Sequence, residues 1–219
     1  MIVYSGLKKD FLASVERDTI AIEIEQKILE KMNKHTPKSE FRSWENSLSY
    51  MYKVLNDSEI PEDAGIAIEY NIPQTSKRVD FLISGYDEKQ NKNVAIVELK
   101  QWESLTAIPG IDAVVETYTG GAVRRVVHPS YQAWSYAQLI KDYNVEVQDG
   151  GIALYPCVCM HNYIRKPHDP VDFEQYRDYY LDAPVYTKGE LYKLRAFIKR
   201  IVKKGDKNET PIEHCWPEA

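Results

Sequence analysis

Two apolar runs of this 219-residue chain carry charged residues at positions where a buried strand rarely holds them. Residues 79–83 contain Asp80, and residues 94–102 contain Glu98 and Lys100. A buried carboxylate is costly unless it is paired or binds a metal. Because side chains alternate along a strand, Glu98 and Lys100 project to the same side. We therefore expect the three charged groups to meet on one face of a sheet.

The polar segment 84–93 between the two runs is rich in turn formers and predicts a hairpin. Antiparallel neighbours would bring Asp80 and Glu98 together, where two carboxylates repel each other unless a divalent metal lies between them. Hard oxygen ligands suit Mg²⁺ or Mn²⁺. Lys100 adds a cation that holds a phosphate or orients a water. This set predicts metal-assisted phosphodiester hydrolysis.

A helix is predicted from Pro129 to about Tyr143, and an apolar strand follows at residues 152–160. Gln132 and Tyr136 are four residues apart and share one helical face. A helix followed by a strand here provides the crossover connection that closes a mixed sheet.

The charged residues resemble a known signature. Asp80, Glu98 and Lys100 match the D…(D/E)-x-K pattern of the PD-(D/E)xK nuclease superfamily, and Gln132 with Tyr136 resembles the Q-x-x-x-Y element of its RecB-like members. The resemblance implies an α/β fold with a restriction-endonuclease-like core. In that core, a mixed central β-sheet is flanked by helices on both faces.

A closer resemblance, over about residues 1–205, is to the N-terminal nuclease-like domain of bacterial Schlafen-like helicases. The segments that carry it are residues 39–44, 69–73, 98–102 and 128–134. Two departures stand out. Val79 occupies the place of the proline that names the superfamily, and the phosphate-binding loop of a helicase motor does not occur. We expect either a free-standing nuclease or the part of a longer chain that precedes its motor.

The resemblance implies that Asp80, Glu98 and the backbone carbonyl of Leu99 bind one or two Mg²⁺ or Mn²⁺ ions. Lys100 would orient or deprotonate the attacking water. A lysine beside two carboxylates stays protonated unless its pKa is depressed, which favours positioning and charge stabilisation over general-base action.

Accessory residues are expected around this set. Gln132 and Tyr136 would hold the nucleophile, the lysine or a substrate phosphate in register. Glu40 or Glu45 would supply a further carboxylate from a helix, and we favour Glu40 over the alternative that both are surface residues. Glu69 ends an apolar run, and it belongs either to the carboxylate cluster or to an edge salt bridge.

A net charge of −5 is not typical of a nucleic-acid-binding protein, so the distribution of basic residues matters more than their total. Arg124 and Arg125 lie between the signature and the helix at Pro129, and Lys77 and Arg78 precede the Asp80 strand. We expect these four to contact substrate phosphates. His128 is a further phosphate contact, unless it packs or caps the helix.

Residues 188–207 hold eight Lys or Arg residues against two acidic ones, a local charge of +6. Their apolar residues follow a helical period, so the basic groups lie opposite a buried stripe. The basic face is either a solvated surface or a phosphate-contacting one.

The expected organisation is one nuclease-like domain over residues 1–205 with a tail at 206–219. It comprises N-terminal helices at 16–33 and from Ser39 as N-cap to about 56, a core at 65–160 with strands at 66–70, 78–84 and 94–101, a hairpin or flap within 103–127, an irregular segment at 162–186, and a basic helix at 188–204.

Three cysteines are too few for a disulfide framework, and no apolar run approaches the length of a membrane span. We expect a cytoplasmic protein with no membrane partner. Cys157, Cys159 and His161 share one face of a strand. They are either buried small residues or, with His214 and Cys215, zinc ligands.

These patterns predict a metal-dependent nuclease. Analogy with the family favours DNA over RNA and implies a role in phage defence or DNA processing. The alternative is a catalytically silent module with the same fold, which binds nucleic acid, forms a homodimer or docks a helicase or ATPase partner.

Overall fold

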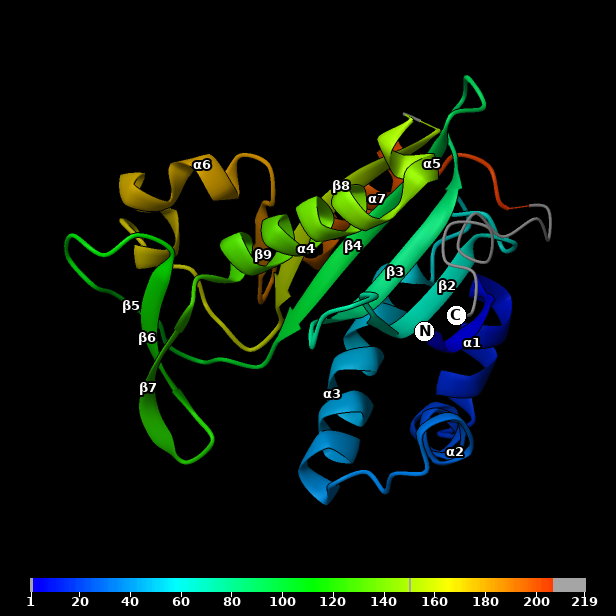
Figure 1. Ribbon diagram of the computed structural model, residues 1–219, viewed down its shortest axis with the longest axis horizontal. Helices are drawn as coiled ribbons and strands as arrows, with labels where there is room; N and C mark the ends of the chain where they lie inside the picture. Colours follow the sequence, from blue (N-terminus) through cyan, green and yellow to red (C-terminus); the bar gives the residue numbers. More distant parts are fainter. Residues whose placement is uncertain (1, 150, 207–219) are drawn as a thin grey trace.

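A mixed six-stranded sheet forms the centre of the protein in a computed structural model that describes residues 2–149 and 151–206 (Figure 1). The strand order is β1-β2-β3-β4-β8-β9. The strands are β1 (Ile2–Leu7), β2 (Gly65–Asn71), β3 (Arg78–Tyr86), β4 (Lys92–Lys100), β8 (Ile152–Met160) and β9 (Val185–Thr187).

Pairing within this sheet confirms the expected hairpin and crossover. β1 to β4 pair antiparallel, whereas β8 runs parallel to β4 and β9 runs parallel to β8. The crossover from β4 to β8 contains α4 (Pro129–Tyr143), whose bounds agree with the sequence prediction. Proline at the first helical position explains the sharp start, since its missing N–H needs no partner there.

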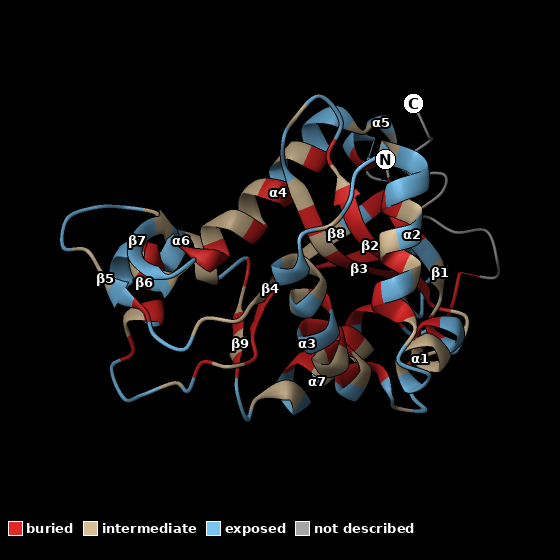
Figure 2. Ribbon diagram, turned by 90° about the horizontal axis from the view of Figure 1, so that it is seen from below, coloured by how far each residue is buried: buried red, intermediate tan, exposed pale blue. Residues whose placement is uncertain are grey.

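Helices cover both faces of the sheet (Figure 1). One face packs against α2 (Ile20–Met32), α3 (Lys38–Leu55) and α7 (Leu191–Ile201), with α1 (Lys8–Glu16) beside them. The other face packs against α4 and α5 (Val145–Gln148). Figure 2 shows the buried residues gathered on the strands between these layers. The expected mixed sheet with helices on both faces is thus present.

A second, three-stranded sheet lies beside the main body, next to α6 (Arg177–Tyr180) (Figure 1). Its strands are β5 (Thr106–Ala107), β6 (Val114–Thr119) and β7 (Ala122–Val127). Gly120 and Gly121 have φ of 59° and 81°, values that favour glycine, and they form the turn between β6 and β7. The predicted hairpin is therefore correct. Two short 3₁₀ helices, Pro170–Asp172 and Glu174–Tyr176, precede α6.

Several predicted boundaries were wrong. The helix expected at 16–33 begins only at Ile20, and the strand and helix that precede it, β1 and α1, were not expected. Pro37, instead of Ser39, occupies the N-cap position of α3. The basic helix is shorter than 188–204, and Asp206 is buried instead of belonging to a tail. The remaining tail, 207–219, lies outside the described residues. Along those residues, no helix is both long and apolar enough to cross a membrane.

Candidate active site

Three carboxylates occupy one row across β2, β3 and β4. The β3–β4 register pairs Phe81 with Val97, so Asp80 and Glu98 come next on their strands. On the other side of β3, the β2 pairs on either side place Glu69 opposite Asp80. The hairpin thus brings Asp80 and Glu98 together as predicted and adds Glu69 to them.

Strand alternation breaks within this row. Ile68 packs on the α3 side of the sheet, but Tyr70, two residues later, packs on the α4 side, where strict alternation would keep both on one face. Between them Glu69 has a φ of 59°, which is rare for a residue with a side chain. Glu69 and Asp80 line a cavity of about 100 Å³ beside α3. Glu98 and Lys100 project to the same side and pair there, as predicted, whereas Asp80 and Glu69 line a cavity beside α3.

Glu98 is 1% exposed and is held by two donors on the α4 side. Its Oε1 accepts hydrogen bonds from Lys100 Nζ at 2.6 Å and from Gln132 Nε2 at 2.6 Å. Its Oε2 is buried and has no hydrogen-bond partner among the described residues. Burial raises the pKa of Glu98 to about 8, with the charge of Asp80 adding to the rise and Lys100 opposing it. A pKa of about 8 leaves Glu98 largely protonated at neutral pH, and a cation bound at Oε2 would favour the ionised form.

Asp80 links this site to the backbone of β4. Its Oδ2 accepts a hydrogen bond from the Leu99 N–H at 2.8 Å, which replaces a ladder bond where the two strands separate. A side-chain hydrogen bond between the Asp80 and Glu98 carboxyl groups also raises the pKa of Glu98, so the two groups are close enough to share a cation.

Lys100 is held as a protonated ammonium. Burial lowers the pKa of Lys100, but the charges of Glu98 and Asp80 raise it more, so the net shift is upward. Its Nζ also lies 5.4 Å from the centre of the Trp102 ring. Lys100 can therefore position a phosphate or a water, but it is poorly suited to remove a proton.

Gln132 and Tyr136 lie side by side on α4, as their spacing predicts. Gln132 Nε2 donates to Tyr136 Oη at 2.9 Å as well as to Glu98. The Tyr136 hydroxyl is thus one step removed from the carboxylates, and Gln132 orients Glu98 directly.

Glu69 belongs to the cluster and also forms a salt bridge, so both expectations hold. It forms an ion pair with Arg78 and accepts a hydrogen bond from Trp44 Nε1 at 2.6 Å. Arg78 also bonds Glu40 Oε1 at 2.7 Å. Burial and then the charge of Asp80 raise the pKa of Glu69 to about 8, although Arg78 opposes the rise. Glu40 lines the same cavity as Asp80, whereas Glu45 is exposed on α3.

The residues expected to bind substrate are dispersed. Lys77 is exposed and lines a second cavity, of about 540 Å³, together with Gln132. Arg124 and Arg125 are exposed on β7, where Arg125 Nε contacts Glu116 at 3.1 Å. Arg78 is already paired with Glu69 and Glu40.

His128 is not a phosphate contact. It is fully buried, its Nδ1 accepts from the Ser130 N–H at 3.2 Å, and its Nε2 lies 3.2 Å from the Val171 carbonyl. Burial lowers the pKa of His128 to about 4. The residue caps α4, which was the alternative reading of its position.

The basic face of α7 is used in part for internal contacts. Lys199 pairs with Glu59 at 2.5 Å, and Arg195 Nε donates to the Val54 carbonyl at 3.0 Å. These bonds join α7 to the end of α3 and the loop after it, so they favour the structural interpretation of this helix.

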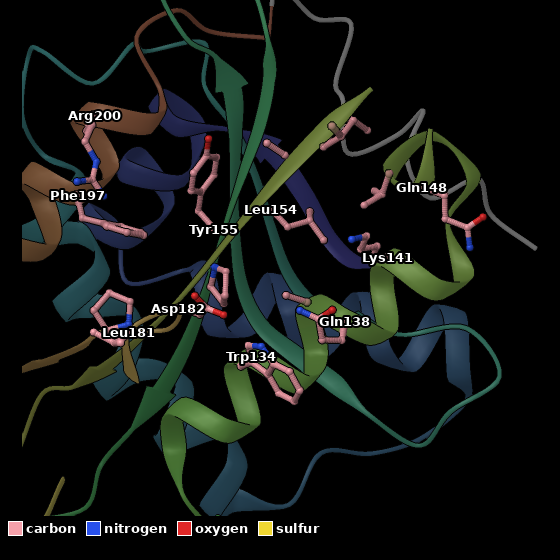
Figure 3. A pocket seen from close by; sticks show the side chains of 16 residues that line it. Trp134, Gln138, Lys141, Gln148, Leu154, Tyr155, Leu181, Asp182, Phe197 and Arg200 are labelled. Atoms are coloured by element: carbon pink, nitrogen blue, oxygen red, sulfur yellow. The ribbon is translucent and has the colours of Figure 1, made fainter. Parts of the chain in front are cut away.

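A larger cavity, of about 620 Å³, lies between α4 and α7 (Figure 3). Figure 3 shows Trp134 and Gln138 on one side, Phe197 and Arg200 on the other, and Tyr155 of β8 between them. None of the signature residues lines this cavity.

A metal site complete in protein ligands does not occur in residues 2–149 and 151–206, where no three His, Cys, Asp or Glu side chains are placed to hold an ion. Cys157 and Cys159 are free and buried in the core, so they are not zinc ligands here; His214 and Cys215 lie outside the described residues. The pair Asp80 and Glu98 nevertheless fits Mg²⁺, which proteins commonly bind through one or two carboxylates plus substrate phosphate and water. The unpartnered Glu98 Oε2 supports this fit.

Sequence reasoning missed a polar network beside Leu99. The side chain of Gln101 donates to Ser43 Oγ at 2.7 Å and to Ser47 Oγ at 3.1 Å. Ser47 in turn lies 3.1 Å from His161 Nε2. Serines in a helix resemble any polar face, so their spacing alone gave no signal.

Comparison with family models, curated proteins and solved structures found no match for this chain.

Proposed function

We propose that this chain is a metal-dependent nuclease that hydrolyses phosphodiester bonds at Asp80, Glu98 and Lys100, on a restriction-endonuclease-like core. The observation that carries the proposal is the state of Glu98. Two donors fix its Oε1, while its buried Oε2 has no partner among the described residues. Together with the neighbouring Asp80 carboxylate and the Lys100 ammonium, this open oxygen provides the ligands and the charge that a divalent cation and a phosphate need.

Charge balance also supports a metal requirement. Glu69, Asp80 and Glu98 form one row, in which Arg78 pairs with Glu69 and Lys100 pairs with Glu98. A phosphodiester adds a further negative charge, which this row would repel. A divalent cation reverses that balance and would make the site attractive to phosphate.

Each residue has a defined role in the proposal. Asp80 Oδ1 and Glu98 Oε2, with the Leu99 carbonyl, would hold Mg²⁺ or Mn²⁺. When bound, the ion would polarise the phosphate and lower the pKa of a water. Gln132 orients Glu98, and the Lys100 ammonium stabilises charge on the phosphate. The family resemblance favours DNA over RNA as the substrate, and it also favours a role in phage defence or DNA processing.

The competing proposal is a silent module that binds nucleic acid, dimerises or docks a helicase or ATPase. The exposed Arg124 and Arg125 favour it, since they lie on a sheet separate from the carboxylates and could bind phosphate without cleavage. Lys77 would then contribute from the groove beside Gln132.

A cleavage assay separates the two proposals. Single- and double-stranded DNA and RNA would be incubated with the protein and Mg²⁺, Mn²⁺ or EDTA. We expect metal-dependent cleavage by the wild type and by Glu45→Gln, an exposed control on α3, and none by Asp80→Asn. Nucleic-acid binding without cleavage of any substrate would favour the silent module. Equal cleavage by Asp80→Asn would refute the assignment.

A further inference from the structure

A buried histidine lies behind the candidate active site. His161 follows β8 and is fully buried, with its backbone N–H bonded to the Lys100 carbonyl at 3.2 Å. Its ring stacks on Tyr50, with 4.2 Å between ring centres. This contact and the backbone bond fix the imidazole plane next to the strand that carries the signature.

The neighbouring amide determines which ring nitrogen carries the proton. Asn162 Nδ2 donates to the Gln101 carbonyl at 3.2 Å, so its oxygen faces His161 Nδ1 at 3.2 Å. An amide oxygen only accepts, and therefore Nδ1 must be the protonated nitrogen. In the neutral ring, Nε2 is then an acceptor.

The direction of the next hydrogen bond follows. Ser47 Oγ lies 3.1 Å from His161 Nε2, so the hydroxyl donates to the ring. The same oxygen accepts from Gln101 Nε2 at 3.1 Å, which leaves one lone pair free. Burial lowers the pKa of His161, with the Asn162 hydrogen bond opposing the fall and the charge of Lys53 adding to it, so the ring is neutral at neutral pH. A histidine that accepts a hydrogen bond from a serine hydroxyl and is oriented by a third group can act as a base toward that hydroxyl.

Ser47 connects this pair to the candidate active site. Ser47 and Asp80 both line the cavity of about 100 Å³ beside α3, which has room for a few waters. Lys100 is held protonated by Glu98, so the attacking water needs another proton acceptor. Building on the proposed nuclease function, we propose that Ser47 and His161 form a proton relay for the water that attacks the phosphodiester.

The step balances in atoms and protons. The water oxygen forms a bond to phosphorus as the bond from phosphorus to the leaving oxygen breaks. The water gives its proton to Ser47 Oγ while the Ser47 proton passes to His161 Nε2, and the leaving oxygen takes a proton from solvent. His161 then returns its proton through Ser47 to solvent. Asn162 and Gln101 position the pair and do not change protonation.

Two measurements test the relay. The first is kcat and KM with Mn²⁺ for Ser47→Ala, with Ser49→Ala as control, since Ser49 on the same helix is exposed and its hydroxyl donates to the Asn46 carbonyl. We expect kcat to fall roughly 10- to 100-fold for Ser47→Ala, with KM within twofold, and to stay unchanged for the control. His161→Gly should lose a similar amount and recover in part with added imidazole.

The second measurement is independent of turnover. Nitrogen-15 NMR of labelled histidines, with His161 assigned by its loss in His161→Gln, should show a protonated Nδ1 and a hydrogen-bonded, unprotonated Nε2 that shifts in Ser47→Ala. A proton on Nε2, or an unchanged kcat in Ser47→Ala, would overturn the relay. A wild type that shows the predicted tautomer but cleaves nothing would instead overturn the nuclease proposal and leave the polarised pair standing.

Discussion

The two ends of the β3–β4 hairpin both bury a carboxylate, but they surround it differently. At the end away from the signature, Asp206 Oδ2 accepts a hydrogen bond from Ser84 Oγ at 2.5 Å. The Asp206 backbone N–H bonds the Asp63 carbonyl at 2.9 Å, and Asn93 Nδ2 bonds the Ile201 carbonyl at 2.9 Å. Here the chain after α7 is fastened to the sheet.

Burial also raises the pKa of Asp206, to about 7, and its Oδ1 has no hydrogen-bond partner among the described residues. Glu98 has the same two properties. A raised pKa and an open oxygen therefore do not mark an active site by themselves. The features that distinguish Glu98 are a bonded lysine and an oriented amide, with the neighbouring Asp80 lining a cavity. Asp206 also has a carboxylate neighbour, Asp63, but its side-chain partner is the neutral hydroxyl of Ser84, so protonation alone can stabilise it.

The largest expected effect contrasts the two carboxylates directly. Glu98→Gln removes the charge that would hold the cation, so metal-dependent cleavage should fall by about 1,000-fold, or roughly 4 kcal/mol of transition-state stabilisation. Asp206→Asn should cleave like the wild type. Rates would be measured at saturating substrate and Mg²⁺, with thermal melts to show that both variants are folded. A comparable loss of cleavage in Asp206→Asn would show that the two carboxyl groups do not differ in function.

The second effect belongs to the far end and concerns stability. A Cβ on Gly65 would lie 2.1 Å from Asp206 Oδ2 and 2.3 Å from Ser84 Oγ, and no room exists for it. Gly65→Ala should therefore cost roughly 2–3 kcal/mol in the free energy of unfolding, measured by denaturant titration. Gly6→Ala is the control, since its nearest contact is the Tyr4 hydroxyl at 3.2 Å. Equal stability of the two variants would show that the packing around Asp206 can accommodate the added methyl group.

The pH dependence of stability sharpens the comparison further. Asp206 and Glu98 have folded-state pKa values raised above their usual ones, to about 7 and about 8. Each group therefore contributes stability that is fully present below about pH 4 and is lost as pH rises through its folded-state pKa. Metal-free protein should lose stability between about pH 4 and pH 8, and Glu69, whose pKa burial raises to about 8, should add to that loss.

Asp206→Asn should reduce that loss, because asparagine resembles the protonated acid. Added Mg²⁺ at pH 8 should stabilise the wild type and Asp206→Asn equally, and Glu98→Gln hardly at all. These curves would be measured by denaturant unfolding at several pH values. Stabilisation by Mg²⁺ that is lost in Asp206→Asn would contradict the assignment of the cation site to Asp80 and Glu98.

The smallest effect is expected at α4. Gln132→Ala removes the amide that orients Glu98, and cleavage should fall about tenfold, as is typical when a partner of a metal ligand is lost. Tyr136→Phe should cost less than threefold, since its hydroxyl touches Gln132 and not the carboxylates. The ratio of the two rates is the measurement, and a larger loss in Tyr136→Phe would reverse the proposed order of contacts.

The sequence predicted the hairpin and α4–β8 well because their signals are local. The apolar runs that contain Asp80 and Glu98 are bounded by turn formers, and Pro129 marks the start of α4. β1 was missed because its identity depends on pairing with β2, about sixty residues away. The N-cap of α3 was misplaced because Ser39 is a better cap by type than Pro37, which occupies the position.

Only those site residues that follow a spacing pattern along the sequence were predictable. Asp80, Glu98, Lys100, Gln132 and Tyr136 follow a pattern of order and spacing. The bonds from Glu69 to Trp44 and from Ser47 to His161 join residues 25 and 114 positions apart. Such contacts depend on how α3 packs against the sheet, and no local pattern encodes them.

The central claim is that Glu98 and Asp80 form a divalent-cation site and Asp206 does not. Calorimetric titration of Mn²⁺ into wild type, Glu98→Gln and Asp206→Asn at neutral pH tests it most directly. We predict equal binding by wild type and Asp206→Asn, and at least about tenfold weaker binding by Glu98→Gln, or 1.4 kcal/mol. Binding by Glu98→Gln as tight as that of the wild type would contradict the account.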